Sequence, residues 1–144
     1  MYKRPLTALA AILPLAASIA TITGLGSAAV IVPAFAHGCT PGFWKNHPED
    51  LPFSETDTLN DLFGTSLSSD LNLTAEEALN AKGGGFNALA RHAVSALANS
   101  ITIDDYKYTT SEVTDLFQDA IDDGNYETIK NKFESANEAP SCPF

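Results

Sequence analysis

Apolar residues recur at helical spacing through the second half of the chain. Residues 86–99 and 110–123 show this most clearly, because their apolar side chains fall at intervals of three and four. These positions are Phe86, Leu89, Ala90, Ala93, Val94 and Leu97 in the first segment, and Val113, Leu116, Phe117, Ala120 and Ile121 in the second. Each segment therefore predicts an amphipathic helix with one buried face.

Capping signals at helix N-termini predict further helices. Thr74 and Thr109 are each followed three positions later by glutamate, which is the capping-box pattern at a helix N-terminus. The full set of predicted helices covers residues 58–63, 74–81, 86–99, 110–123 and a last segment that begins near Asn125, with Tyr126, Ile129 and Phe133 facing inward. Only residues 101–108 have strand character, and that stretch is short.

Residues 37–57 are rich in proline, glycine and aromatic side chains. Turn signals of this kind favour irregular backbone, so we expect an ordered arm whose Phe43 and Trp44 pack onto the helices. The predicted fold is all-α: a compact bundle of four to five short helices with an irregular N-terminal arm.

The first 36 residues differ from the rest. Lys3 and Arg4 precede residues 6–36, none of which is charged, and Ala34-Phe35-Ala36 fits a signal-peptidase site. We expect residues 1–36 to be a cleaved signal peptide, with an uncleaved single-pass membrane anchor as the alternative. Either way, residues 37–144 form one domain outside the cytoplasm, and any membrane contact runs through residues 6–36.

The two cysteines, Cys39 and Cys142, lie at opposite ends of this domain. An even number in an exported chain favours a disulfide, which would close the helix bundle at both ends. Two unpaired thiols and a lipid-modified Cys39 are the alternatives.

The net charge of the chain limits the classes of partner that it can bind. Formal net charge is −10 over 144 residues, and residues 37–144 carry 18 acids against six bases. Such acidity excludes nucleic acid and anionic lipid headgroups as partners. One acidic stripe, formed by Glu112, Asp115, Asp119 and Asp122, follows a predicted helix face; no EF-hand loop fits it, so we interpret it as a solvated surface.

The histidines suggest one metal site. Cleavage after Ala36 would make His37 the mature N-terminus, and its α-amine and imidazole could chelate Cu(II) together with His47 in a histidine brace. His92 is different, because it lies about 140° from the apolar face of its predicted helix and is expected at the surface. Apart from this copper alternative we expect no cofactor. No nucleophile motif stands out either, so an enzyme is the weaker expectation.

Three segments carry a family resemblance: Cys39-Thr-Pro-Gly-Phe-Trp-Lys-Asn-His47, Gly83-Gly-Gly-Phe-Asn-Ala-Leu-Ala-Arg-His-Ala-Val94 and the closing Cys142-Pro-Phe. Together they resemble small exported modules of bacterial and archaeal cell-surface proteins, for which no activity is established. The resemblance spans the whole of residues 39–144 and implies a cell-surface location. It also places Trp44, Lys45 and His47 in the shared pattern.

These observations lead to two functional hypotheses. The first is a secreted or surface-tethered, non-catalytic module that contacts an extracellular protein or envelope component. Phe43 and Trp44 anchor the arm on the helices or, if they are exposed, form a binding surface together with Lys45. The second is a copper-binding or copper-dependent redox protein that uses His37 and His47.

Overall fold

The computed structural model describes residues 37–144, so the expected signal peptide or anchor, residues 1–36, lies outside the described residues. The described part of the chain contains six α-helices and one short 3₁₀ helix. Their bounds are α1 Pro41–Asn46, η1 Pro48–Asp50, α2 Leu59–Phe63, α3 Ala75–Asn80, α4 Gly85–Thr102, α5 Thr110–Asp123 and α6 Tyr126–Asn137. The all-α prediction is therefore confirmed.

Capping explains where several helices begin. Thr58, Thr74 and Thr109 each precede a helix and accept a hydrogen bond from the backbone N–H three positions later. In each case the acidic side chain at that third position bonds back to the backbone N–H of the threonine, which completes the capping box. The two capping boxes predicted from sequence are confirmed, and the third, at Thr58, uses Asp61 instead of glutamate.

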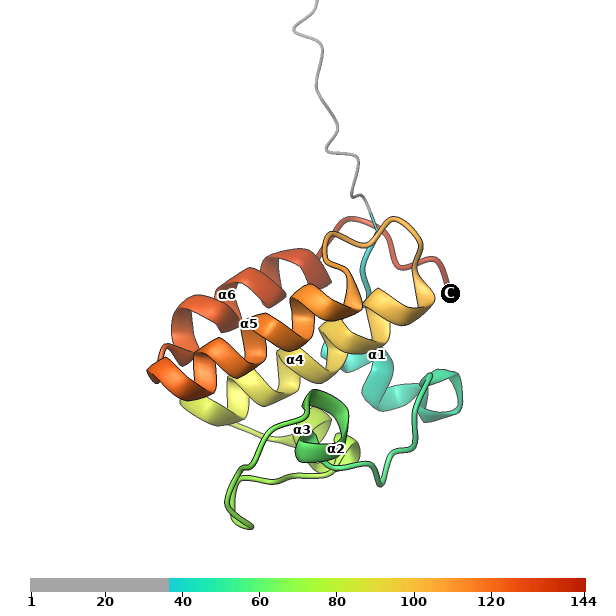
Figure 1. Ribbon diagram of the computed structural model, residues 1–144. Coiled ribbons are helices and arrows are strands. Elements are labelled where there is room, and N and C mark those ends of the chain that lie inside the picture. The colour runs from blue at the N-terminus through green and yellow to red at the C-terminus, as the bar shows by residue number, and fades with distance from the viewer. Residues whose placement is uncertain (1–36) are drawn as a thin grey trace, which may run out of the picture. The chain divides into compact units, whose positions relative to one another are not determined.

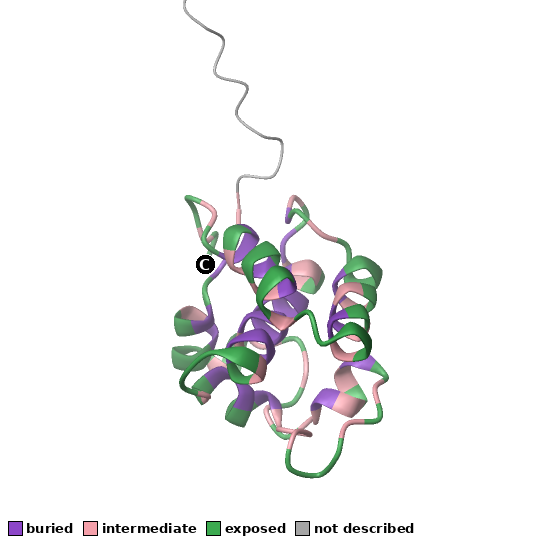
Figure 2. Ribbon diagram, turned by 90° about the vertical axis from the view of Figure 1, so that its left-hand side faces the viewer, coloured by how far each residue is buried: buried purple, intermediate pink, exposed green. Residues whose placement is uncertain are grey.

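Helix α4 is the central element of the described residues. It contacts α1, α3, α5 and α6, and α5 and α6 also contact each other, so these three long helices run side by side (Figure 1). Figure 2 shows the buried positions gathered on the inward faces of the helices. The largest fully buried apolar side chains are Trp44, Phe63, Phe117, Phe133, Leu59, Leu89, Val94 and Val113.

Two segments differ from the predictions. The arm is not wholly irregular, because residues 41–46 form α1; Thr40 caps that helix and Pro41 occupies its first turn, where the missing N–H of proline costs nothing. Likewise, residues 101–108 form no strand. Helix α4 continues to Thr102, and a loop follows to the cap at Thr109.

A disulfide joins Cys39 to Cys142, as predicted. Beside it, His37 and Ser141 form a bridge in which the Gly38 N–H donates to the carbonyl of Ser141 at 3.0 Å. The two ends of the described domain therefore lie together. Over residues 37–144, no helix combines the length and the apolar character needed to cross a membrane.

Candidate functional site

Trp44 is held inside the domain. Its side chain is fully buried, and its indole Nε1 donates a hydrogen bond to Oδ1 of Asn99 in α4 at 3.0 Å. The expectation that Trp44 packs onto the helices is confirmed, and its burial excludes this side chain from the alternative, a binding surface. The residue anchors the arm, while Phe43 is half-buried and Lys45 is exposed.

Asn99 satisfies all of its hydrogen-bonding capacity in this interior. Its Oδ1 also accepts from the backbone N–H of Cys39 at 3.1 Å, and its Nδ2 donates to the Cys39 carbonyl at 2.8 Å and to Oδ1 of Asn137 at 2.9 Å. Ser95 donates to the same Cys39 carbonyl at 2.9 Å. Buried polar groups are stable only when paired in this way, so the network fixes the position of the arm.

The network continues into α6. Asn137 accepts a second hydrogen bond from the hydroxyl of Tyr106 at 2.7 Å and donates to the backbone carbonyl of His92 at 2.9 Å. Burial raises the pKa of the Tyr106 hydroxyl well above its usual range, which keeps that group protonated as a donor. These residues are structural, and the helical spacing of apolar residues does not predict them.

An aromatic patch lies where the arm meets the C-terminus. We define it as Phe43, His47 and Phe144. The ring of Phe43 stacks on His47 with centroids 4.5 Å apart and lies 5.5 Å from the ring of Phe144. Phe144 is 58% exposed, and with Ile101 it is one of two exposed large apolar side chains among the described residues. Exposed aromatic rings of this kind are suited to binding.

His47 also lies beside two acids. Its Nδ1 is 3.5 Å from Oε1 of Glu49 and 3.9 Å from Oδ2 of Asp50. One candidate ligand atom from each residue lies within 4.8 Å of the others, and all three residues are exposed. Among residues 37–144, no other group of three such side chains comes this close.

His37 has different neighbours. Its Nδ1 is 2.5 Å from Oδ2 of Asp105, in the loop between α4 and α5. The contacts of the His37 and His47 imidazoles share no residue, and His37 does not join the group around His47. The copper brace of His37 and His47 stays a prediction.

His92 is buried, not exposed as the helical pattern indicates. Helix α6 covers this side of α4 and leaves His92 only 6% accessible. Burial lowers the pKa of the imidazole to about 4, against the opposing effect of Glu134, whose carboxylate lies 3.7 Å from Nε2. The other ring nitrogen, Nδ1, has no hydrogen-bond partner among the described residues. One apolar face was visible in the sequence, but α4 is covered on more than one side.

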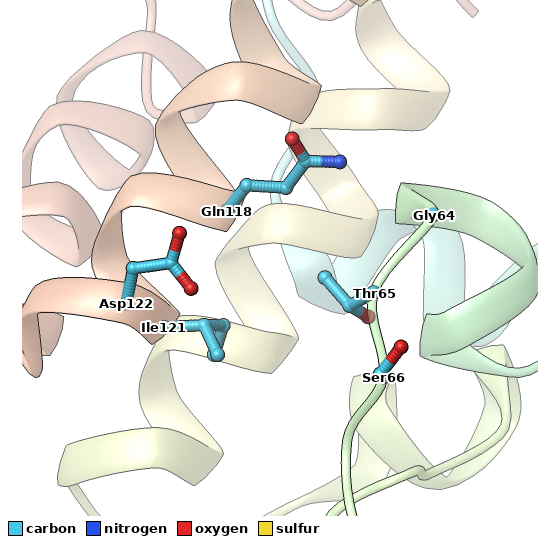
Figure 3. Close-up of a pocket in the computed structure, with 6 residues that line it drawn as sticks. All are labelled: Gly64, Thr65, Ser66, Gln118, Ile121 and Asp122. Atoms are coloured by element: carbon cyan, nitrogen blue, oxygen red, sulfur yellow. The ribbon is translucent and has the colours of Figure 1, made fainter.

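A hollow of about 350 Å³ lies between α5 and residues 64–66, which follow α2. Figure 3 shows Gln118, Ile121 and Asp122 of α5 opposite residues 64–66. The side-chain amide nitrogen of Gln118 already has a hydrogen-bond partner, because Nε2 donates to the carbonyl of Phe63 at 2.6 Å. The carboxylate of Asp122 is the one charged group in the lining of this hollow. The hollow therefore lacks the set of polar groups that a catalytic or metal site needs.

Most of the described chain is similar to a known protein family. The model of the protodermal factor 1 C-terminal domain, a plant family, matches residues 39–141. No curated protein and no solved structure matches the chain significantly. The expected kinship with exported modules of bacterial and archaeal cell-surface proteins is therefore wrong: the same segments belong to a different family.

Proposed function

We propose that this chain, which belongs to the protodermal factor 1 C-terminal domain family, is a non-catalytic interaction module that acts outside the cytoplasm, either secreted or tethered to the cell surface. The partner we propose is an extracellular protein or envelope component. It would contact the aromatic patch of Phe43, His47 and Phe144.

Exposure of Phe144 is the observation that carries this proposal. A 58% exposed phenylalanine loses apolar contact with water when a partner covers it, and Phe43 beside it would be covered as well. The buried Trp44 lies 5.5 Å from the Phe144 ring and supports it from below. A partner would thus contact aromatic side chains that pack against the buried ring of Trp44.

Export has separate support. The Cys39–Cys142 disulfide is typical of oxidising compartments, and the uncharged run of residues 6–36 behind Lys3 and Arg4 is typical of a secretory leader. Intact mass and N-terminal sequencing of the exported protein test this directly. We expect a chain that begins at His37 and carries an oxidised cysteine pair. A reduced, full-length chain retained inside the cell would contradict export.

Contact through the patch needs its own test. Benzoylphenylalanine placed at position 144 should, on irradiation of the intact cell surface or medium, form one dominant covalent adduct. The matched control places the same group at Ile101, which is 49% exposed on α4 and lies outside the patch. Equal adduct patterns from both positions, or none from position 144, would rule out the patch as the binding surface.

A further inference from the structure

We propose that His47, Glu49 and Asp50 form a binding site for a divalent first-row transition metal, with Zn²⁺ and Cu²⁺ as the ions of best fit. The site lies on the turn that follows α1. It offers one imidazole nitrogen and two carboxylate oxygens, all within 4.8 Å of one another, which is close enough for one ion to bind all three after small side-chain adjustments.

The backbone of this turn is already fixed. The His47 N–H donates to the carbonyls of Phe43 and Trp44, and the Asp50 N–H donates to the carbonyl of His47 at 3.1 Å. Pro48, which lies between these two N–H groups, restricts the backbone further. Because Trp44 secures α1 in the core, the donor residues project from a rigid support.

The imidazole is also oriented. Its ring lies on the ring of Phe43 with an interplanar angle of 23°, and in this position Nδ1 faces both carboxylates. Within residues 37–144, the side chains of these three residues contact one another and are not engaged in hydrogen bonds with other residues. The donor atoms are therefore available to an ion.

The donor set selects the kind of ion. Imidazole suits Zn²⁺ and Cu²⁺, whereas Ca²⁺ and Mg²⁺ prefer oxygen ligands and, for Ca²⁺, more of them than this turn supplies. A cation would also relieve the repulsion between the two neighbouring carboxylates. This site differs from the histidine brace, because Glu49 and Asp50 take the place of His37 and no free N-terminus is required. The site shares His47 with the aromatic patch, but metal binding is proposed from the donor atoms alone and does not require a partner at the patch.

The test is calorimetric titration of the purified, oxidised protein with Zn²⁺, Cu²⁺ and Ca²⁺. We expect one site per chain, tighter for Cu²⁺ than for Zn²⁺, with at least a tenfold loss of affinity in His47→Gln and a several-fold loss in each of Glu49→Gln and Asp50→Asn. All three positions are exposed, so the variants should fold, and the fluorescence of Trp44 checks this.

Two matched controls separate the alternatives. Glu112→Gln with Asp115→Asn removes two exposed acids from α5, and His37→Gln removes the other proposed copper ligand; both should leave the affinity within twofold of the unchanged protein. The proposal is overturned if His47→Gln binds Zn²⁺ normally, if Ca²⁺ competes equally, or if His37→Gln abolishes binding. It is also overturned if Zn²⁺ does not bind at millimolar concentration.

Discussion

Trp44 and Asn99 are joined by a hydrogen bond of 3.0 Å, from the indole Nε1 to the side-chain oxygen, inside the hydrophobic core. The two residues are 55 positions apart in the chain. This bond ties the N-terminal arm to the central helix α4, and the same amide of Asn99 binds the backbone of Cys39. The arm is thus part of the core and not an appendage.

Asn99→Ala should lower the free energy of unfolding by about 3–4 kcal/mol, because it leaves the buried N–H groups of Trp44 and Cys39 without an acceptor. Trp44→Phe should cost less, about 1–3 kcal/mol, since one donor disappears together with part of the ring. Urea denaturation followed by circular dichroism measures both. The control is Asn131→Ala on the exposed face of α6, which should change stability by less than about 0.5 kcal/mol. An Asn99→Ala effect as small as this control would show that the network adds no stability.

Two glycines of the arm should respond oppositely to alanine. A Cβ atom at Gly38 would lie 2.3 Å from the carbonyl oxygen of Ala136, so Gly38→Ala must push the arm away from α6 and should cost about 1–3 kcal/mol. At Gly42, in α1, the nearest atom is Thr40 Oγ1 at 3.6 Å, so Gly42→Ala should be neutral or stabilise by up to about 1 kcal/mol. The melting temperatures of the two variants, compared with that of the unchanged protein, test this difference. Equal destabilisation by both would refute the close packing at Gly38.

Breaking the disulfide should lower the free energy of unfolding by up to about 4–5 kcal/mol, because Cys39 and Cys142 close a loop of 103 residues. Trp44 is the single tryptophan of the chain, so its fluorescence reports on the arm alone. Cys39→Ser with Cys142→Ser should bring the urea midpoint down, and tryptophan exposure should precede or accompany the loss of helix. Helix loss ahead of any change in fluorescence would contradict a disulfide that mainly secures the arm.

Acid should destabilise the protein through His92. Burial lowers the pKa of this imidazole to about 4 in the folded state, while the unfolded value stays near 6.5, so the unfolded chain binds the proton more readily. Stability contributed by the neutral ring is complete above pH ~6.5 and is lost as pH falls towards 4, by about 2 kcal/mol between pH 7 and 5.

The charges of Glu134, Arg91 and Lys130 also act on the pKa of this imidazole, Glu134 raising it and the two cations lowering it. A hydrogen bond from Lys130 lowers the pKa of Glu134, so acid titrates that carboxylate below its ordinary range, at lower pH than the loss from His92. Denaturation midpoints of the unchanged protein and of His92→Leu, measured from pH 7 to pH 5, separate the contribution of His92 from that of Glu134. We expect the variant to show a much flatter dependence over this range; an unchanged slope would assign it to other groups.

Local patterns predicted most of the helices. Spacing of apolar residues located α4, α5 and α6, and threonine caps located the starts of α3 and α5 to within a residue. The turn signals of residues 37–57 predict irregular backbone, although a capping threonine followed by proline, as at Thr40 and Pro41, also begins a helix. Residues 101–108 have β-branched and aromatic side chains, yet Tyr106 is used for a buried hydrogen bond to Asn137 and not for strand pairing.

The site was less accessible to sequence reasoning. Asn99 and Asn137 look like ordinary polar helix positions, and only the packing of α4 against α6 and the arm makes them interior. The same packing buries His92. By contrast, the spacing of His47, Glu49 and Asp50 was visible in the sequence, and attention to a one-turn cluster of nitrogen and oxygen donors would have found it.

The closure of the domain at its two ends has a mechanical consequence. Because His37 pairs with Ser141 and Cys39 is bonded to Cys142, a pulling force applied to the chain on either side of the domain passes through one covalent bond. The helices between these points carry none of that load. Tension that would unravel an open helical bundle from its ends leaves this one folded for as long as the sulfur–sulfur bond holds.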